Sequence, residues 1–307
     1  MKAPPKNKVA SVLARLRNIA TQRSLSFNDV LQTYCNERFL ARLAKSSKSD
    51  TVLLKGAQML RVWGVSHARP TMDIDLLRRG EADQASLIKL VEEWVATEIA
   101  DDGVVFFPSS ITAESIRDET DYVGTRIRLD ARLDKVRQKV QIDFGVGDAV
   151  HPAPTVIEYP VLLDKELIKL NAYPVEASIA EKFHAMVHLD MRNSRMKDFY
   201  DIWVLSQTLP FRGETLSRAI RETFERRETA VPKDTPTAFT ERFFADASHV
   251  RQWAAFAKPI AGDEVAADFG VVAKAIAEFL KPAIAAAADS KGLRTEWSPG
   301  GPWRKKS

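Results

Sequence analysis

Residues 71–77 constrain this chain more than any other segment, because polar and apolar side chains alternate along them. Asp73 and Asp75 occupy alternate positions, and apolar residues occupy the positions beside them. A period of two residues is typical of a β-strand with one buried face. The segment therefore predicts a strand that projects both carboxylates from the same face.

A tight turn is predicted shortly before this strand. The apolar run 51–54 leads into Lys55, Gly56 and Ala57, and a helical pattern follows at residues 58–63. This order predicts a strand, a turn and a helix. Glycine has no Cβ, so the backbone of such a turn can approach phosphate oxygens closely. The turn is therefore a candidate nucleotide-binding site.

Two carboxylates beside a phosphate-binding turn suit a magnesium ion. Mg²⁺ prefers near-octahedral oxygen ligands, usually one or two carboxylates together with phosphate oxygens and water. Asp143, on a strand predicted at residues 137–144, can complete a two-metal clamp or accept a proton from an attacking hydroxyl. Asp73, Asp75 and Asp143 are therefore candidate metal ligands. The alternative for the first two is an ordinary charge pair or salt-bridge partners on an edge strand.

Further charged residues could support phosphoryl chemistry. Arg69 lies in the loop before the aspartate strand, Lys182 lies in a helix predicted at 176–190, and Arg195 and Asp198 follow closely. A lysine facing the carboxylates would neutralise triphosphate charge, and a carboxylate could act on the nucleophile. The alternative is a solvent-facing ion pair on surface helices.

The predicted elements indicate an α/β (α+β) fold with several parts. Helices at 6–21 and 27–45 come first, and strands at 104–107, 122–133 and 137–144 follow. The proline-bearing stretch 151–160 is expected to be a connector, and most of the rest is predicted to be helical, including a helix at 236–257. We expect N-terminal basic helices at 1–48, a core domain at 49–160 and a helical C-terminal domain at 161–282. Residues 283–307, rich in Ala, Gly and Pro, are expected to form a mobile tail.

Charge is unevenly distributed along the 307 residues. Residues 1–49 contain ten Lys and Arg against Asp29 and Glu37, a net of +8, which leaves the remainder at −4 because the total is +4. A basic arm can hold RNA through phosphate contacts. The alternative is a solvated face on two surface helices.

No apolar stretch approaches the roughly 18 to 20 residues of a membrane-spanning helix. The basic N-terminus is not followed by the apolar block of a secretory signal, since Arg15 and Arg17 interrupt residues 9–19. We therefore expect a cytoplasmic protein with no membrane partner.

The order of these motifs resembles the AbiEii/AbiGii family of nucleotidyltransferase toxins, to which the MenT toxins are related. The resemblance covers roughly residues 30 to 230. The matching segments are FLARL at 39–43, LKGA at 54–57, RPTMDIDLL at 69–77, VQIDFG at 140–145, IAEKF at 179–183 and NSRMKDFYD at 193–201.

The resemblance implies a polymerase-β-like minimal nucleotidyltransferase core with a mixed sheet, followed by a helical C-terminal domain. It also implies an NTP substrate and Mg²⁺ or Mn²⁺. By the family pattern, Asp73 and Asp75 would bind the metal and Asp143 would support them. Lys182 would contact the triphosphate, and Asp198 would be a catalytic carboxylate.

Two positions near the predicted site need separate comment. The turn often reads Gly-Gly or Gly-Ser in such enzymes, whereas Ala57 offers no hydroxyl to the phosphates. Thr71 is predicted on the same strand face as the aspartates, so a phosphate on it would add about two negative charges beside the metal site. Regulatory modification of Thr71 is therefore a hypothesis, and the alternative is a plain β-branched strand residue.

Three functions remain open from the sequence. The first is a toxin of a type IV-like toxin–antitoxin system that transfers a nucleotide from an NTP to RNA, plausibly the tRNA 3′ end. It would inhibit translation until a cognate antitoxin neutralises it. The second is a non-catalytic NTP-binding module that acts through a partner, and the third is a metal-dependent nuclease or phosphohydrolase. Three aspartates crowded on one face disfavour the second, because like charges close together are costly without a cation.

Overall fold

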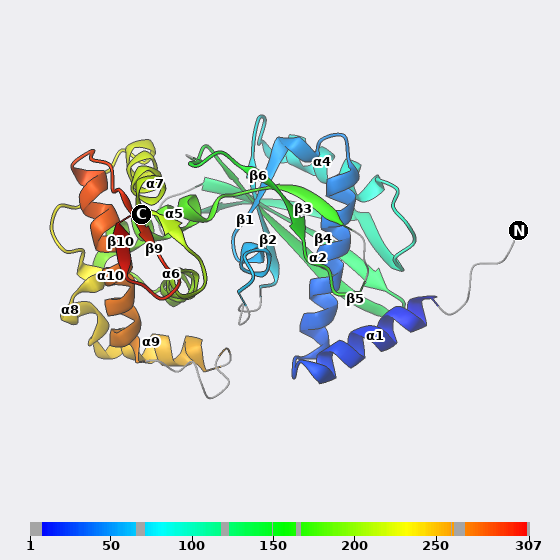
Figure 1. The fold of residues 1–307 in the computed structure, drawn as a ribbon. Helices are drawn as coiled ribbons and strands as arrows, with labels where there is room; N and C mark the ends of the chain where they lie inside the picture. The colour runs from blue at the N-terminus through cyan, green and yellow to red at the C-terminus, as the bar shows by residue number, and fades with distance from the viewer. Residues whose placement is uncertain are drawn as a thin grey trace, which may run out of the picture. The chain divides into compact units, whose positions relative to one another are not determined.

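A computed structural model describes residues 8–65, 71–117, 123–148, 150–163, 167–258, 260 and 268–305 of the chain. The chain forms two compact units. The sheet unit comprises Met1–Val62, Pro70–Gly147 and Thr155–Ala172, and the helical unit comprises Trp63–Arg69, Asp148–Pro154 and Tyr173–Ser307. The expected mixed-sheet α/β class with a helical C-terminal part is confirmed (Figure 1).

The sheet unit is built on a seven-stranded sheet with the order β3-β4-β5-β2-β1-β7-β6. Its two parallel pairings are β2 with β5 and β1 with β7, and the other neighbours are antiparallel. The strands are β1 (Val52–Lys55), β2 (Asp73–Arg78), β3 (Val104–Arg117), β4 (Val123–Leu133), β5 (Val136–Val146), β6 (Thr155–Tyr159) and β7 (Ile168–Ala172). The helices of this unit are α1 (Lys8–Gln22), α2 (Phe27–Lys45), α3 (Gln58–Val62) and α4 (Gln84–Ala96), with a short 3-10 turn at Ser49–Thr51.

One face of this sheet carries the core of the unit. Helices α2 and α4 pack against it and against each other, and in Figure 1 α2 runs beside the sheet. Trp94 of α4 stacks on Phe144 of β5 with ring centroids 6.1 Å apart, and Phe39 of α2 meets Trp94 edge-on at 6.0 Å. Because side chains alternate across a strand, covering this face leaves the other set of positions on the opposite face.

The strand predictions around the aspartates are confirmed, but two strands of this sheet, β6 and β7, were missed. The stretch predicted as a connector at 151–160 contains β6, which pairs with β7. Pro152, Pro154 and Pro160 surround β6 and gave the segment the composition of a loop. Its place at the edge of the sheet explains the error, since edge strands tolerate nearby proline.

The N-terminal helices are part of the sheet unit and do not form a separate domain. Helix α2 contacts both β5 and β7. Arg38 is only 2% exposed, and Arg42 pairs with Asp102 at 2.7 Å. At the surface, Lys48 pairs with Glu93 at 2.7 Å. Part of the basic charge predicted for the arm is therefore matched by acids of the same unit.

The helical unit surrounds a core of aromatic side chains. Phe199, Phe243 and Phe269 pack together, with centroid separations of 5.2 to 6.1 Å. The single helix predicted at 236–257 is divided, because Asp246 caps a new helix by accepting from Ser248 N and His249 N. The helices are α5 (Val175–Leu189), α6 (Met196–Thr208), α7 (Gly213–Arg226), α8 (Glu241–Phe244), α9 (Ala247–Ala257) and α10 (Phe269–Ala288), with 3-10 turns at Asp190–Arg192 and Thr237–Phe239.

The prediction of a mobile tail at 283–307 is wrong for the residues described there. Residues 283–288 end α10, and β9 (Thr295–Trp297) pairs with β8 (Phe211–Arg212) and β10 (Trp303–Lys305) in a three-stranded sheet. Trp297 is 3% exposed and donates to Ser206 O at 2.7 Å. Trp303 donates to Phe279 O at 2.9 Å. Two tryptophans supply the burial that the surrounding Ala, Gly and Pro residues lack.

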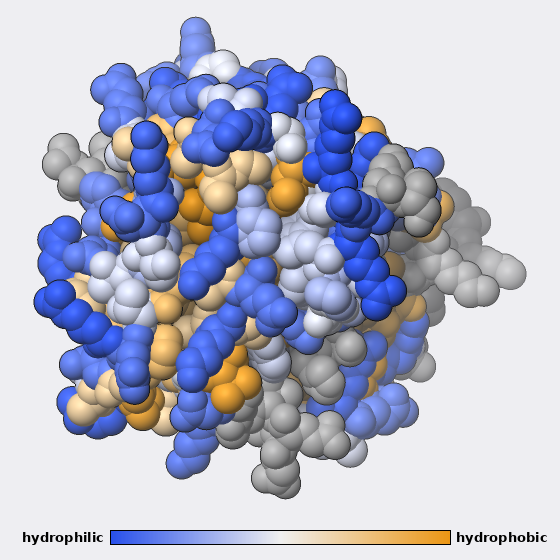
Figure 2. Space-filling view, turned by 60° about the vertical axis from the view of Figure 1, so that its left-hand side comes forward, coloured by the Kyte–Doolittle hydropathy of each residue, from blue (hydrophilic) through white to orange (hydrophobic). Residues whose placement is uncertain are grey.

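No described helix combines the length and the apolar character needed to cross a membrane. The face of the molecule in Figure 2 is mainly hydrophilic, and hydrophobic residues reach the surface in small patches among polar side chains.

The buried position of Trp297 gives a stability prediction. Trp297→Ala should lower the free energy of unfolding by about 3–5 kcal/mol, because it leaves a large cavity and removes the hydrogen bond to Ser206 O. Arg304→Ala, at an exposed position on the neighbouring strand, is the matched control and should cost less than about 0.5 kcal/mol. Urea unfolding measures both values. Equal stability of the two variants would contradict the docking of the C-terminal strands.

Candidate active site

The predicted aspartates lie on the face of the sheet opposite α2 and α4. Along β2, Ile74 and Leu76 are buried, whereas Asp73 and Asp75 are half-buried. In the parallel pairing with β5, Asp73 lies opposite Gln141 and Asp75 opposite Asp143. The two carboxylates therefore project from one face, as the alternation predicted.

Gly56 brings the turn after β1 into close contact with Asp75. A Cβ added at Gly56 would lie 1.8 Å from Oδ2 of Asp75 and 2.5 Å from its carboxyl carbon. Gly56 also has a φ of +71°, a conformation that side-chain-bearing residues rarely adopt. The carboxylate thus occupies the space that any other residue would fill, and the turn presents backbone beside it.

Two further predicted residues lie near the aspartates: Lys55 directly precedes Gly56, and Thr71 lies shortly before β2. Lys55 is paired with Asp75 across β1 and β2, and directly opposite side chains of an antiparallel pair share a face. Thr71 precedes β2, which begins at Asp73, so the strand-face argument for it does not hold. Its hydroxyl lies 3.5 Å from the carbonyl oxygen of Asp73. Arg69, the cation expected in this loop, lies outside the described residues.

Asp143 is held by an arginine. Its two oxygens accept from Nε and Nη2 of Arg126 on β4, at 2.8 and 2.7 Å. Among the described residues, no group of three acidic, histidine or cysteine side chains is arranged to hold a metal ion. The assignment of Asp143 as a third metal ligand beside Asp73 and Asp75 stays a prediction, and in this structure the Asp143 carboxylate is bound by Arg126.

Arg126 places positive charge on the same face as the aspartates. Its hydrogen bonds to Asp143 raise its pKa above the usual range despite partial burial, and the charges of Asp143 and Asp73 add to this effect. In the next row, Arg128 donates to Gln141 at 3.2 Å. The sequence analysis missed both arginines, although their alternation along β4 was visible. The face can therefore attract anionic phosphates as well as a cation.

A second group of predicted residues forms an ion cluster in the helical unit. Lys182 of α5 lies 2.9 Å from Oδ1 of Asp198 and 2.8 Å from Oδ2 of Asp201, both on α6. Arg195, at the N-cap of α6, lies 2.6 Å from Oδ2 of Asp198. The fully buried Asn193 supports this arrangement by accepting from the backbone N–H of Arg195 at 2.9 Å.

The acidic side chains of this cluster are buried, whereas the basic side chains are partly exposed to solvent. The Asp198 and Asp201 side chains are 1% exposed, whereas those of Lys182 and Arg195 are 15% and 24% exposed. Burial alone would raise the pKa of Asp198, but the charges of Lys182 and Arg195 hold it well below its usual range. Asp198 is therefore a weak base that anchors two cations. Asp201 was not predicted, although its three-residue spacing from Asp198 places both on one helix face.

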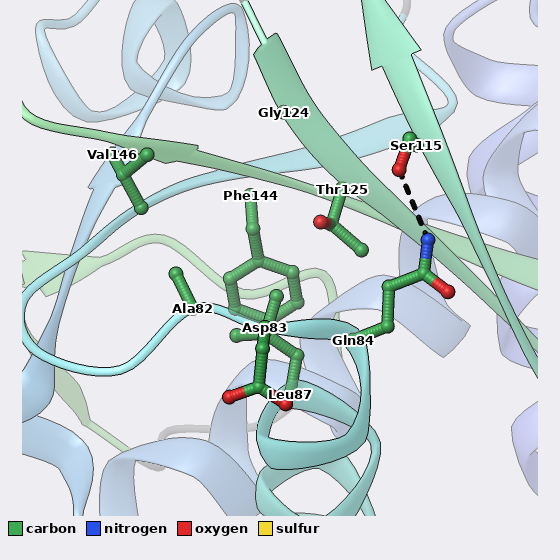
Figure 3. A pocket seen from close by; sticks show the side chains of 9 residues that line it. All are labelled: Ala82, Asp83, Gln84, Leu87, Ser115, Gly124, Thr125, Phe144 and Val146. Atoms are coloured by element: carbon green, nitrogen blue, oxygen red, sulfur yellow. Dashed lines mark hydrogen bonds between the residues drawn. The ribbon is translucent and has the colours of Figure 1, made fainter.

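A separate pocket lies near the start of α4 (Figure 3). Gln84 donates to Ser115 at 3.0 Å along one side of it. Phe144 lines the pocket, and its side chain belongs to the sheet face opposite Asp143. None of the predicted site residues lines it. The full lining is Ala82, Asp83, Gln84, Leu87, Ser115, Gly124, Thr125, Phe144 and Val146.

A comparison with protein families identifies the family of this chain. The family model for the nucleotidyl transferase AbiEii toxin of type IV toxin–antitoxin systems matches residues 38–287. This span includes every predicted site residue. The chain belongs to the AbiEii toxin family and is, as a member of it, a nucleotidyltransferase. Family membership favours the transferase hypothesis over a non-catalytic module or a nuclease.

Two solved structures also resemble the chain. A candidate nucleotidyltransferase from H. pylori aligns at 16% identity with a TM-score of 0.49, over 84% of this chain and 98% of that one. JHP933 from Helicobacter pylori aligns at 16% identity with a TM-score of 0.48, over 84% and 95% of the two chains. No curated protein gives a significant match. The family assignment rests on the family match.

The contact between Gly56 and Asp75 gives a first test of the site. Gly56→Ala should reduce nucleotide transfer at least about 100-fold, because its methyl group displaces the Asp75 carboxylate and misplaced reacting groups lose about this much rate. The matched control is Gly64→Ala, since Gly64 has a similar φ of +73° and nothing within 4 Å of an added Cβ. Activity is measured alongside thermal unfolding. Similar losses in both variants would mean that backbone strain alone causes the effect.

The buried cluster gives a pH-dependent stability prediction. Asp198→Asn should cost about 3–5 kcal/mol at pH 7, because it removes one partner of buried ion pairs. The folded-state pKa of Asp198 is lowered, so its stabilisation is complete above the unfolded pKa of about 3.9 and is lost as pH falls below it.

The difference between wild type and Asp198→Asn should therefore stay constant from pH 5 to 8 and shrink below about pH 4. Urea unfolding across this range measures it. The control is Asp289→Asn, whose exposed carboxylate pairs with Lys291. A difference that grew on acidification would contradict the assigned charge state.

Proposed function

We propose that this chain is a metal-dependent toxin that transfers a nucleotide from an NTP to RNA, with the tRNA 3′ end as acceptor. A cognate antitoxin would neutralise it. The observation that carries the proposal is the pair Asp73 and Asp75, half-buried on one face of β2, with the Asp75 carboxylate lying against the Gly56 backbone. A site for a metal ion and a triphosphate needs carboxylates for the ion and, beside them, backbone that the phosphates can approach closely.

The residues of this face fit Mg²⁺ or Mn²⁺. Asp73 and Asp75 offer hard oxygen atoms two residues apart, which suits an ion that takes one or two carboxylates and completes its shell with phosphate and water. The space above Gly56, which a Cβ would fill, is where the Asp75 carboxylate already lies. Asp73 and Asp75 would hold the metal. When bound, the ion would neutralise negative charge that develops on the phosphate oxygens.

The remaining residues of the sheet unit would bind and orient the NTP. The Gly56 and Ala57 backbone offers a surface without bulky side chains, and Lys55 shares the face of Asp75. The bidentate pair with Asp143 fixes the guanidinium of Arg126. We assign Arg126 to phosphate contact and Asp143 to its orientation, in place of a direct role for Asp143 as a metal ligand.

In the helical unit, we propose that Lys182 and Arg195 supply positive charge for the triphosphate. Both retain some exposure, and Asp198 and Asp201 fix their heads from the buried side. Asp198 would then act by positioning these cations, because its low pKa disfavours proton uptake. Such preorganised charges stabilise a transferring phosphoryl group without reorganising during the reaction.

The acceptor and the antitoxin rest on family membership. The family match names a type IV toxin–antitoxin system, which implies an antitoxin partner. In the proposed reaction, the acceptor hydroxyl oxygen bonds to the α-phosphorus and gives up its proton to solvent water. The bond between the α-phosphorus and the oxygen shared with the β-phosphate breaks, and pyrophosphate leaves.

The proposal is tested by incubating the protein with total bacterial tRNA, Mg²⁺ and each α-labelled NTP in turn. Label should enter RNA with the wild type. Asp75→Asn and Lys182→Ala should each lower the rate by about 100-fold or more, since each removes several kcal/mol of charge stabilisation. The control is Asp130→Asn, which changes a 42% exposed carboxylate in a 4.0 Å pair on the same sheet.

Two outcomes would overturn the assignment. Shortened RNA without incorporated label would establish a nuclease. Incorporation that persists in Asp75→Asn would show that the metal-binding role of the β2 aspartates is wrong.

A further inference from the structure

Three amide side chains are buried around the start of β2. Gln32 and Asn36 of α2 and Gln58 of α3 are 2%, 1% and 2% exposed. Burying an amide is costly unless its polar atoms find partners. Apolar residues at these positions would cover the sheet without this requirement, so the partners of the amides show what they contribute.

Asn36 holds the peptide group before Asp73. Its Nδ2 donates to the carbonyl oxygen of Met72 at 3.1 Å. A second hydrogen bond fixes the orientation of the Asn36 amide, because its Oδ1 accepts from Nε2 of Gln32 at 3.0 Å. Gln32 also donates to the carbonyl of Lys139 on β5 at 3.2 Å. The donor that reaches Met72 is thus fixed by the helix and by the neighbouring strand.

Gln58 holds the peptide group after Asp73. Its Nε2 donates to the carbonyl oxygen of Asp73 at 3.2 Å. Its Oε1 accepts from the hydroxyl of Tyr159, which in turn accepts from Arg61 at 3.1 Å. Arg61 is anchored on the fully buried Glu37 at 2.9 Å.

The strand pairing explains why Gln58 is needed. The last pair between β1 and β2 is Lys55 with Asp75, after which the chain leaves β1 through the Gly56 turn. No β1 residue therefore lies opposite Asp73 in the ladder. The side chain of Gln58 satisfies a carbonyl that a longer β1 would otherwise bind.

The two carbonyls belong to the peptide planes on either side of the Asp73 Cα. The planes are rigid, and only the φ and ψ angles of Asp73 relate them. Fixing both planes therefore fixes the direction of the Asp73 Cα–Cβ bond. We infer that Asn36 and Gln58 are positioning residues that aim the Asp73 carboxylate at the metal. This inference rests on the proposed role of Asp73 as a metal ligand.

The test measures Mn²⁺ binding to the full chain in the absence of NTP, by titration calorimetry and by the electron paramagnetic resonance signal of unbound Mn²⁺. The variants are Asn36→Leu and Gln58→Met, which keep the side-chain volume and add no charge near the metal. The control is Gln138→Met, because Gln138 is also buried, at 9% exposure, but donates to Asn28 and not to β2. Thermal unfolding of each variant is recorded, and binding is measured at least 15 °C below the midpoint.

Asn36→Leu and Gln58→Met should weaken Mn²⁺ binding by about tenfold or more, the usual effect of losing a group that orients a metal ligand. Gln138→Met should bind Mn²⁺ as the wild type does, even if it unfolds at a lower temperature. If one variant fails to fold, the other carries the test. In transfer assays, raising Mn²⁺ should restore much of the rate of the positioning variants but not that of Asp73→Asn.

Two failures are distinguishable. Wild-type binding of Mn²⁺ in a folded Asn36→Leu or Gln58→Met protein would overturn the positioning role and leave the metal site intact. If Asp73→Asn and Asp75→Asn bind Mn²⁺ as the wild type does, the proposed metal site itself is wrong, and the inference fails with it.

Discussion

The approach of the Asp75 carboxylate to the Gly56 backbone is the constraint around which the sheet unit is arranged. It requires a residue without a Cβ in a left-handed conformation, at the point where β1 ends. It also requires the antiparallel register that places Lys55 opposite Asp75. Shifting this register by one residue would turn the aspartates toward α2 and α4, to the face where Ile74 and Leu76 are now buried.

Charge is handled differently in the two units. On the sheet face, Asp143 neutralises Arg126, and half-buried aspartates remain in reach of solvent. In the helical unit, Lys182 and Arg195 are matched by two acids that are almost completely buried. The buried acids fix the lysine and arginine heads, because long cationic side chains otherwise lose considerable rotamer freedom when they bind an anion.

The errors of the sequence analysis have particular causes. Strand β6 was taken for a connector because prolines surround it, and the pairing with β7 that stabilises it is not visible in local composition. The C-terminal segment was taken for a tail because its Ala-rich and Gly- and Pro-rich composition offers little side-chain surface to bury. Trp297 and Trp303 hold it, and their partners Ser206 and Phe279 come from distant helices. The pairing of Asp143 with Arg126 was missed because the strand pattern predicts which face Asp143 occupies but not which residue lies opposite it.

The sequence by itself determined the local features of the candidate site. The alternation of polar and apolar residues placed Asp73 and Asp75 on one strand face, and glycine marked the turn, because both features depend only on neighbouring residues. The order of the motifs along the chain indicated the family. Tertiary structure decided which charges meet. Strand order brought Arg126 to Asp143, and helix packing brought Lys182 to Asp201. Packing also set Asn36 and Gln58 on the peptides around Asp73, since contacts between distant segments depend on register and burial that no local pattern encodes.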